Sequence, residues 1–174
     1  MNIKEKELED WLVENEMDYF YNGENPEFTI YRQFDIAPYG IMDIVAVRKK
    51  DGIIEIEVWE LKSEELNISH IKQLYSYICG LIRNIPEKVN VLIKPKLLFY
   101  KEGNSIDESI YIIQFLKERT FSPSLHIKGL DLYSYCVTLD EGIVITNENP
   151  EDYKRDNAIK KSQIDLLLCR KNRG

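Results

Sequence analysis

The 174-residue sequence predicts one α/β domain in which a small mixed β-sheet is flanked by helices. Three observations predict this class. Residues 3–15 carry apolar side chains at the spacing of an amphipathic helix. Three segments with the two-residue alternation of β-strands follow. Residues 67–85 return to the helical spacing and residues 89–100 read as a further strand, so the predicted order is αβββαβ.

The first helix is predicted to present one apolar stripe to the core. Leu8 and Leu12 lie on this stripe, Glu5 falls beside it, and Glu9 points more outward. Residues 16–27, which contain Asn-Gly and Asn-Pro, predict a turn region after the helix.

The three strands are expected at residues 28–34, 41–47 and 53–62. A turn at residues 37–40 separates the first two strands. The Asp-Gly pair within residues 49–52 is typical of a tight hairpin. The second and third strands are therefore expected to be neighbours in the sheet.

The second helix is expected over residues 67–85, with Asn67 as its N-cap and Pro86 as its stop. The next strand, at residues 89–100, contains Pro95, which cannot donate a backbone hydrogen bond. We expect this proline to weaken or bend the middle of that strand.

The remaining residues are expected to extend a core of about residues 3–100 within a single domain of residues 1–174. The extension, residues 101–174, comprises a helix from a capping box at Ser105 through about residue 118, strands at residues 125–139 and 143–146, a short docking helix at residues 164–168, and a basic tail.

Composition and charge restrict the class of protein. The sequence is 44% hydrophobic and 30% charged and has no membrane-spanning run, so a globular cytoplasmic protein is expected. A formal net charge of −7 makes the chain a poor non-specific binder of nucleic acid, and any such contact must come from a local patch. The basic residues within 158–174 are the best candidate. The acidic N-terminal half suits a hard cation or, alternatively, a solvated surface.

Charged residues at core-facing positions of the third strand form the candidate site. Alternation places Glu60 and Lys62 on the same face as Ile56 and Val58. Ionised groups in a core are costly unless they pair with each other or hold a metal. This cost makes the stretch a candidate functional site.

Three other acids in the predicted sheet complete the charge pattern. Asp43 interrupts the apolar run of the second strand. Glu55 and Glu57 fall on the more polar face of the third strand and are expected to face solvent. A register slip of one residue would exchange their roles with that of Glu60.

Four short motifs lie at fixed places in these elements: Glu5-x-x-Leu8 through Leu12, Gly40-x-x-Asp43, Glu60-Leu61-Lys62 and Gln73-x-x-x-Tyr77. Together they resemble the core of the PD-(D/E)xK nuclease superfamily. The resemblance is strongest to its RecB-like branch, which includes archaeal endonucleases that act on branched or mismatched DNA. It spans about residues 3–82 and implies a restriction-endonuclease-like core. Met42 stands where the superfamily name has Pro, and the chain beyond residue 100 matches no known pattern.

The resemblance implies a nuclease that uses Mg²⁺ or Mn²⁺ to hydrolyse phosphodiester bonds, with DNA as the expected substrate. In this family pattern Lys62 would orient the attacking water, and Gln73 and Tyr77 would donate hydrogen bonds to the phosphate or to Lys62. The implied metal ligands are Glu5, Asp43, Glu60 and the backbone carbonyl of Leu61. The implied catalytic set is Asp43, Glu60, Lys62, Gln73 and Tyr77.

Each of these residues also has an ordinary structural interpretation. Glu5 alone would be a first-turn acid that favours the helix dipole, and Glu9 is its rival for the metal. Glu60 and Lys62 could form a simple ion pair. Tyr77 could be part of the helix packing.

Three functions therefore stay open: a nuclease, a catalytically inactive nuclease-fold subunit for binding or regulation, and a small-ligand enzyme or interaction protein whose resemblance to nucleases is accidental. The choice between DNA and RNA and between endo- and exonuclease is not determined. A homodimer is also open, because many nucleases of this type act as dimers.

Overall fold

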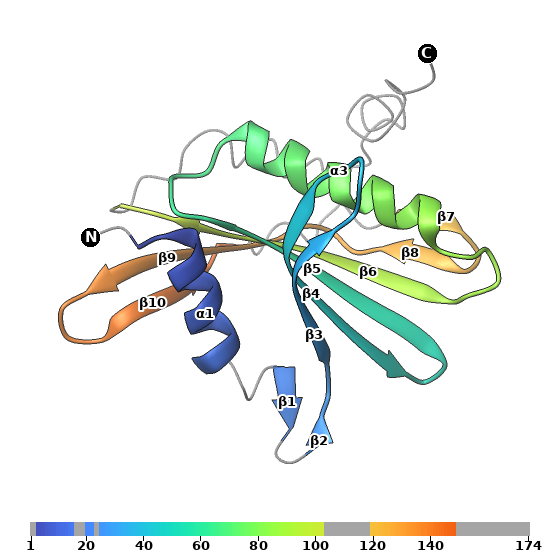
Figure 1. The fold of residues 1–174 in the computed structure, drawn as a ribbon, viewed down its shortest axis with the longest axis horizontal. Coiled ribbons are helices and arrows are strands. Elements are labelled where there is room, and N and C mark those ends of the chain that lie inside the picture. The colour runs from blue at the N-terminus through green and yellow to red at the C-terminus, as the bar shows by residue number, and fades with distance from the viewer. Residues whose placement is uncertain (1–2, 16–19, 23–24, 103–118, 149–174) are drawn as a thin grey trace.

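The computed structural model describes residues 3–15, 20–22, 25–102 and 119–148. Within them, a central β-sheet lies between two helices (Figure 1). The elements in chain order are α1 (Glu5–Asn15), β1 (Tyr21–Asn22), β2 (Asn25–Pro26), β3 (Thr29–Asp35), β4 (Ile41–Lys50), β5 (Ile53–Lys62), α3 (Ile68–Asn84), β6 (Val91–Tyr100), β7 (Arg119–Ser122), β8 (Leu125–Ile127), β9 (Asp131–Thr138) and β10 (Gly142–Asn147). Apart from the short β1–β2 hairpin, the elements through β6 follow the predicted αβββαβ order, and the α/β class is confirmed.

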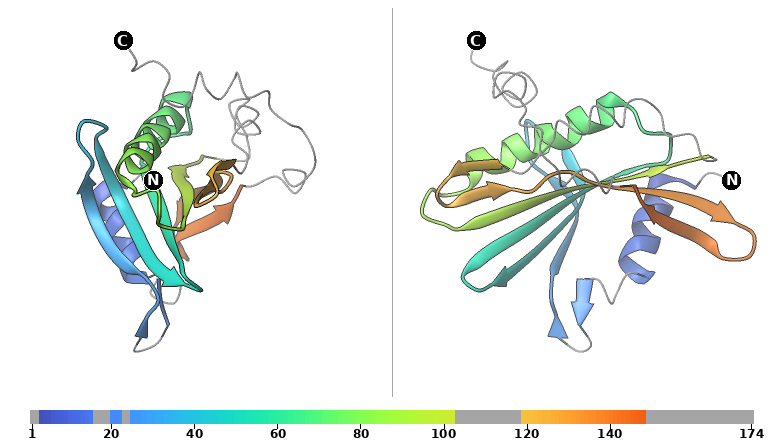
Figure 2. Two further views of the ribbon diagram at one scale, coloured as in Figure 1. Left: turned by 90° about the vertical axis from the view of Figure 1, so that its right-hand side faces the viewer. Right: turned by 180° about the vertical axis from the view of Figure 1, so that it is seen from behind.

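The sheet is mixed and has eight strands in the described part of the chain, with a main path β10-β9-β6-β5-β4-β3. Strands β3, β4 and β5 form an antiparallel meander. Helix α3 then crosses over the sheet, and β6 pairs in parallel with β5. Strands β8 and β9 both pair in parallel with β6, and β10 folds back antiparallel on β9. The strands fan out around a central crossing point, as Figure 2 shows.

The sheet separates two hydrophobic clusters. On one face Leu74 of α3 packs with Val58 of β5. On the opposite face Leu8 and Leu12 of α1 pack with Leu61 of β5. Alternate residues of β5 therefore enter the two clusters, and both faces of this strand are covered.

Strand β6 accommodates Pro95 without interruption. On one edge Pro95 pairs with Val58 of β5. On the other edge β8 pairs with residues 91–93 and β9 with residues 96–100, so the proline lies between the two partner strands. A missing N–H costs little at this position, and the predicted weakening of the strand is not observed.

Helix α3 begins and ends as the sequence predicts. The Asn67 side chain accepts a hydrogen bond from Ser69 N at 2.9 Å, and His70, which is buried, completes the capping box. The helix ends at Asn84, shortly before Pro86. Neither of the described helices is long and apolar enough to cross a membrane.

The C-terminal part differs from prediction in two respects: strand β7 (Arg119–Ser122) was not predicted, and one predicted strand is divided. Residues 125–139 were expected to form one strand, but residues 128–130 divide the segment into β8 and β9. The division lets both pieces pair with β6 at different positions. The predicted strand at residues 143–146 lies within β10. The helices predicted through about residue 118 and at residues 164–168, and the basic tail, lie outside the described residues.

Candidate active site

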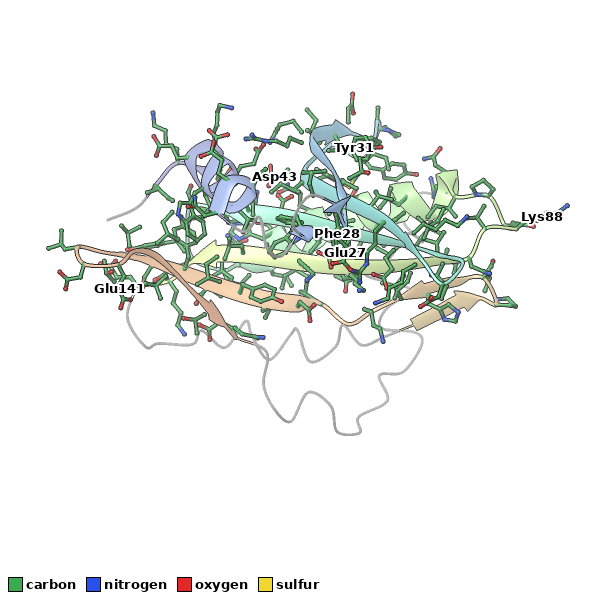
Figure 3. The ribbon with its side chains drawn as sticks, turned by 90° about the horizontal axis from the view of Figure 1, so that it is seen from below. Glu27, Phe28, Tyr31, Asp43, Lys88 and Glu141 are labelled. Carbon is green, nitrogen blue, oxygen red and sulfur yellow. The ribbon has the colours of Figure 1, made fainter. Side chains whose placement is uncertain are left out.

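Asp43 and Glu60 lie on neighbouring strands where the β4–β5 ladder ends. Ile44 and Trp59 form the last ladder pair, and Asp43 and Glu60 are the next residues on their strands. Asp43 Oδ2 accepts a hydrogen bond from the backbone N–H of Leu61 at 2.8 Å. This bond ties β4 to β5 just beyond the ladder and fixes one oxygen of Asp43, which is labelled in Figure 3.

Glu60 is fully buried and poorly satisfied. It has 0% exposure, and neither carboxylate oxygen has a hydrogen-bond partner within the described part of the chain. Lys62 Nζ lies 2.7 Å from Glu60 Oε1 and forms an ion pair with it, but outside the geometry of a hydrogen bond. Burial, and then the charge of Asp43, raises the pKa of Glu60 from 4.5 to about 7, although Lys62 acts in the opposite direction.

The same surroundings shift Asp43 and Lys62. Burial raises the pKa of Asp43, against the opposing effects of the Leu61 N–H and of Lys62. Burial alone would lower the pKa of Lys62, but Glu60, Glu5 and Asp43 together raise it. Lys62 therefore stays positively charged at neutral pH, beside two acids that hold their protons more tightly than usual.

Glu5 and Glu9, the two rival carboxylates of α1, have different surroundings. Glu5 Oε1 accepts a hydrogen bond from Ser63 N at 3.4 Å, and its charge acts on all three site charges described above. The expectation that Glu9 points outward is wrong, because its side chain is buried with 4% exposure. Arg32 binds one of its oxygens, and Gln33 Nε2 donates to the other at 2.7 Å. Glu5 is thus the carboxylate of α1 that acts on Asp43, Glu60 and Lys62, whereas both oxygens of Glu9 are bound by side chains of β3.

Gln73 and Tyr77 lie one turn apart on α3 and contact each other. Gln73 Nε2 donates a hydrogen bond to Tyr77 Oη at 2.5 Å. Burial raises the pKa of Tyr77, and the charges of Glu60 and Asp43 add to this rise, so the phenol stays protonated at neutral pH. Gly40 lets the ring approach, because a Cβ at this residue would lie 2.7 Å from Tyr77 Cε1. The ring therefore packs against the turn that leads into β4.

The expectation that Glu55 and Glu57 face solvent is wrong. Glu57 is 2% exposed, lies 3.5 Å from Lys96 Nζ and accepts a hydrogen bond from Trp59 Nε1 at 3.2 Å. Glu55 is half-buried and lies 3.1 Å from Lys94 Nζ. Both acids are covered because β5 is a central strand whose second face packs under the α1 cluster.

Sequence analysis missed Arg32 and Gln33 of β3. Arg32 forms ion pairs with both Glu9 and Asp10 of α1. Gln33 Nε2 lies 3.3 Å from Asp43 Oδ1. Arg32 alternates with apolar residues in its strand, and this signal could have identified it; no sequence pattern marks Gln33.

The donor set at Asp43 and Glu60 suits a hard divalent cation. Both oxygens of Glu60 lack hydrogen-bond partners, and a cation would offset the repulsion between two neighbouring carboxylates. Within the residues that the structure describes, no group of three or more His, Cys, Asp or Glu side chains is arranged to hold a metal ion. Mg²⁺ is usually bound by one or two carboxylates together with waters and substrate phosphates, and two carboxylates meet that requirement.

Comparisons with known proteins give limited information. No family model and no curated protein matches this sequence. Among solved structures, the chain is similar to a repair endonuclease from Pyrococcus abyssi, with 23% sequence identity and a TM-score of 0.40. The similarity covers 57% of this chain and 38% of the endonuclease, so this chain spans well under half of that protein.

Proposed function

We propose that this chain is a metal-dependent nuclease that hydrolyses phosphodiester bonds, with DNA as its substrate. The observation that carries the proposal is Glu60, a carboxylate with 0% exposure and no hydrogen-bond partner among the described residues, beside Asp43 and paired with Lys62. An acid in this state destabilises the folded protein. Strongly shifted acids with specific charged neighbours concentrate at functional sites, which favours catalysis over a structural role.

Asp43 and Glu60 would hold Mg²⁺ or Mn²⁺ through carboxylate oxygens. The backbone carbonyl of Leu61 is the proposed third oxygen, and Glu5 would bind the ion or one of its waters from α1. When bound, such an ion supplies hydroxide at neutral pH and offsets the charge of the pentacovalent transition state. The chain prepares the site beforehand, because the Leu61 N–H already orients the Asp43 carboxylate.

Lys62 and Tyr77 are the proposed donors to the reacting phosphate and water. The pKa of Lys62 is raised, so its ammonium keeps a full positive charge near the two acids. The pKa of Tyr77 is also raised, so its hydroxyl acts as a hydrogen-bond donor and not as a base. Gln73 donates to Tyr77 Oη and thereby leaves the Tyr77 proton to point elsewhere. Fixed donors of this kind stabilise charge that develops in a transition state.

A nucleic-acid partner follows from the proposed chemistry. The net charge of −7 makes broad electrostatic attraction to the DNA backbone weak. The basic residues within 158–174 remain the candidate contact, together with Lys62 in the site. A homodimer would bring two sites to the two strands of a duplex and remains part of the proposal.

The proposal is tested by measuring cleavage of single-stranded, duplex and branched DNA with Mg²⁺ or Mn²⁺. We expect the unmodified protein to cleave at least one of these substrates, and Asp43→Ala and Lys62→Ala to abolish the cleavage. Glu141→Ala serves as the control, because Glu141 is an exposed acid in the β9–β10 turn, away from Asp43 (Figure 3). Activity that survives in either site variant would contradict the assignment.

A second function, that of a nuclease-fold subunit without catalysis, is favoured by two observations. Lys62 already neutralises Glu60. Among the described residues, no group of three or more His, Cys, Asp or Glu side chains is arranged to hold a metal ion. Titration calorimetry with Mn²⁺ separates the two functions. Absence of binding at millimolar Mn²⁺, with DNA binding retained, would favour the non-catalytic subunit.

A further inference from the structure

Gln33 occupies an irregular position in the edge strand β3. Arg32 pairs with Ile44 and Phe34 pairs with Met42, but Gln33 and Asp43 between them are not a ladder pair. The backbone of Gln33 has φ of +48°, in the left-handed region that non-glycine residues seldom adopt. The strand is therefore distorted at the residue opposite the candidate metal ligand.

The distortion brings the Gln33 side-chain amide between two carboxylates. Its Nε2 donates to Glu9 Oε2 at 2.7 Å and to Asp43 Oδ1 at 3.3 Å. Ionised carboxylates only accept hydrogen bonds, so the group between them must be the NH₂ and not the carbonyl of the amide. One nitrogen with two protons satisfies both acceptors.

Asp43 is thereby held from two neighbouring strands. Leu61 N, on β5, donates to Oδ2 at 2.8 Å, and Gln33, on β3, donates to Oδ1. Two donors on different oxygens fix the rotation of the carboxylate about its Cβ–Cγ bond. Each oxygen keeps a lone pair for a further ligand.

Glu9 anchors the amide in turn. Glu9 is 4% exposed, and Arg32 bridges it to Asp10 on the same helix. These contacts fasten α1 to β3 at the distorted residue, so Gln33 cannot rotate away without leaving the buried Glu9 with one donor fewer.

We propose that Gln33 is a positioning residue that fixes the carboxylate of Asp43 for metal binding, with Glu9 as its anchor. This inference rests on the proposed function, because it assigns Asp43 a metal. Hydrogen-bonded partners of metal ligands typically contribute about 10- to 100-fold in metal affinity or activity. The competing explanation is that the distortion only protects a sheet edge from pairing with other chains.

The test compares Gln33→Met and Gln33→Gly with the unmodified chain of residues 1–174. Gln33→Met keeps the length of the side chain and removes the donor. Gln33→Gly removes the donor and suits the positive φ, so a loss of folding stability from backbone strain is not expected. We expect both variants to bind Mn²⁺ about 10- to 100-fold more weakly in titration calorimetry. Both leave Glu9 with one donor fewer, but Gln33→Gly relieves the positive φ, so it should unfold at a higher urea concentration than Gln33→Met.

A double-mutant cycle tests the role of Glu9. If Glu9 acts through the amide, Glu9→Met weakens Mn²⁺ binding in the unmodified chain but adds little in the Gln33→Met background. Fully additive losses would overturn the anchoring role.

The failures of the two proposals are distinguishable. An unmodified chain that neither binds Mn²⁺ nor cleaves DNA would overturn the proposed function, and the inference with it. An unmodified chain that binds Mn²⁺, with Gln33 variants of unchanged affinity, would overturn the inference alone.

Discussion

Two buried glutamates on β5, three residues apart, lie on opposite faces of the sheet and have different surroundings. Glu57 faces the α1 cluster, where Lys96 Nζ lies 3.5 Å away and Trp59 Nε1 donates a hydrogen bond at 3.2 Å. Glu60 faces the α3 side and has Lys62 as an ion-pair partner, but no hydrogen-bond partner among the described residues. Both are almost inaccessible, with 2% and 0% exposure. Burial alone therefore does not distinguish a structural acid from a functional one.

Glu57 and Glu60 differ in whether their neighbours compensate the carboxylate charge. Around Glu57, the Lys96 ammonium also lies over the Trp59 ring, 4.9 Å from its centroid, so the charges are enclosed by partners on both strands. Around Glu60, the neighbouring Asp43 is itself an acid and raises the pKa of Glu60 further. The first arrangement stabilises a completed ion pair. The second is improved by adding a cation.

The largest expected difference between the two acids is in nuclease activity. Glu60→Gln should lower kcat/KM by about 10³-fold, because a metal ligand contributes several kcal/mol to transition-state stabilisation. Glu57→Gln should leave kcat/KM of the folded fraction within about threefold, since Glu57 lies on the other face. Cleavage kinetics at saturating Mn²⁺, corrected for the folded fraction, measure both. Equal losses in the two variants would remove the distinction.

Folding stability should also distinguish the two variants, but here Glu57→Gln should have the damaging effect and Glu60→Gln should not. Glu57→Gln removes the carboxylate 3.5 Å from the buried Lys96 ammonium and leaves Asp131 Oδ2 at 3.9 Å, so it should lower the free energy of unfolding by about 3 kcal/mol. Glu60→Gln removes a carboxylate whose ionised form is disfavoured by burial and by Asp43. At pH 8 this substitution should raise the free energy of unfolding by about 1 kcal/mol. Urea denaturation at pH 8 without metal measures both changes. Destabilisation of similar size in both variants would mean that Glu60 is a structural acid as well.

Sequence patterns could predict the position of Glu60 but not the surroundings of Glu57. Period-two alternation depends only on the strand, and it correctly placed Glu60 on the face that α3 covers. The same alternation made the face of Glu57 appear polar. That face is buried because the α1 cluster packs on it, and Lys96, a residue of the parallel strand β6, supplies the charge that compensates Glu57 there. A sequence pattern in one strand cannot show which charges a distant strand will place beside it.

The environment of Asp43 shows a second limit of sequence analysis. Its position in an apolar run was visible, and its hydrogen bond to Leu61 N follows from pairing of adjacent strands. The contact with Gln33 was not visible, because it depends on one residue with positive φ that disrupts the β3 ladder. Local irregularities of this kind follow from tertiary contacts, here those between β3 and Glu9 on α1.

The pH dependence of the free energy of unfolding should also show the raised pKa of Glu60. Its pKa rises from 4.5 in the unfolded chain to about 7 in the folded chain, so the folded state holds a proton that the unfolded state loses within this window. The contribution of Glu60 to the free energy of unfolding should therefore fall by about 3 kcal/mol as pH rises from 4.5 to 7, whereas the lowered pKa values of Glu55 and Glu148 act with the opposite sign. The raised pKa of Asp43 acts with the same sign as that of Glu60. Metal-free urea denaturation across this range measures the fall, and Glu60→Gln should remove most of it.

Mn²⁺ affinity should have the opposite pH dependence. The ion binds ionised carboxylates, so affinity should rise as pH increases through 7, with proton release on binding in the same window. Calorimetry in buffers of different ionisation enthalpy measures the released protons. Affinity that is constant between pH 5.5 and 8 would contradict the shifted pKa of Glu60.

The smallest expected effect compares two tyrosines on the two faces. Tyr77→Phe removes a hydroxyl whose raised pKa keeps it a donor near the acids, and should lower kcat about tenfold with little change in Mn²⁺ affinity. Tyr133→Phe is the control. The Tyr133 ring stacks on Trp59 on the α1 side of the sheet, with 5.6 Å between ring centroids, and the stack does not need the hydroxyl. Single-turnover cleavage measures the chemical step in both variants. Equal rates for Tyr77→Phe and Tyr133→Phe would show that the Tyr77 hydroxyl only packs beside Gln73 and takes no part in the reaction.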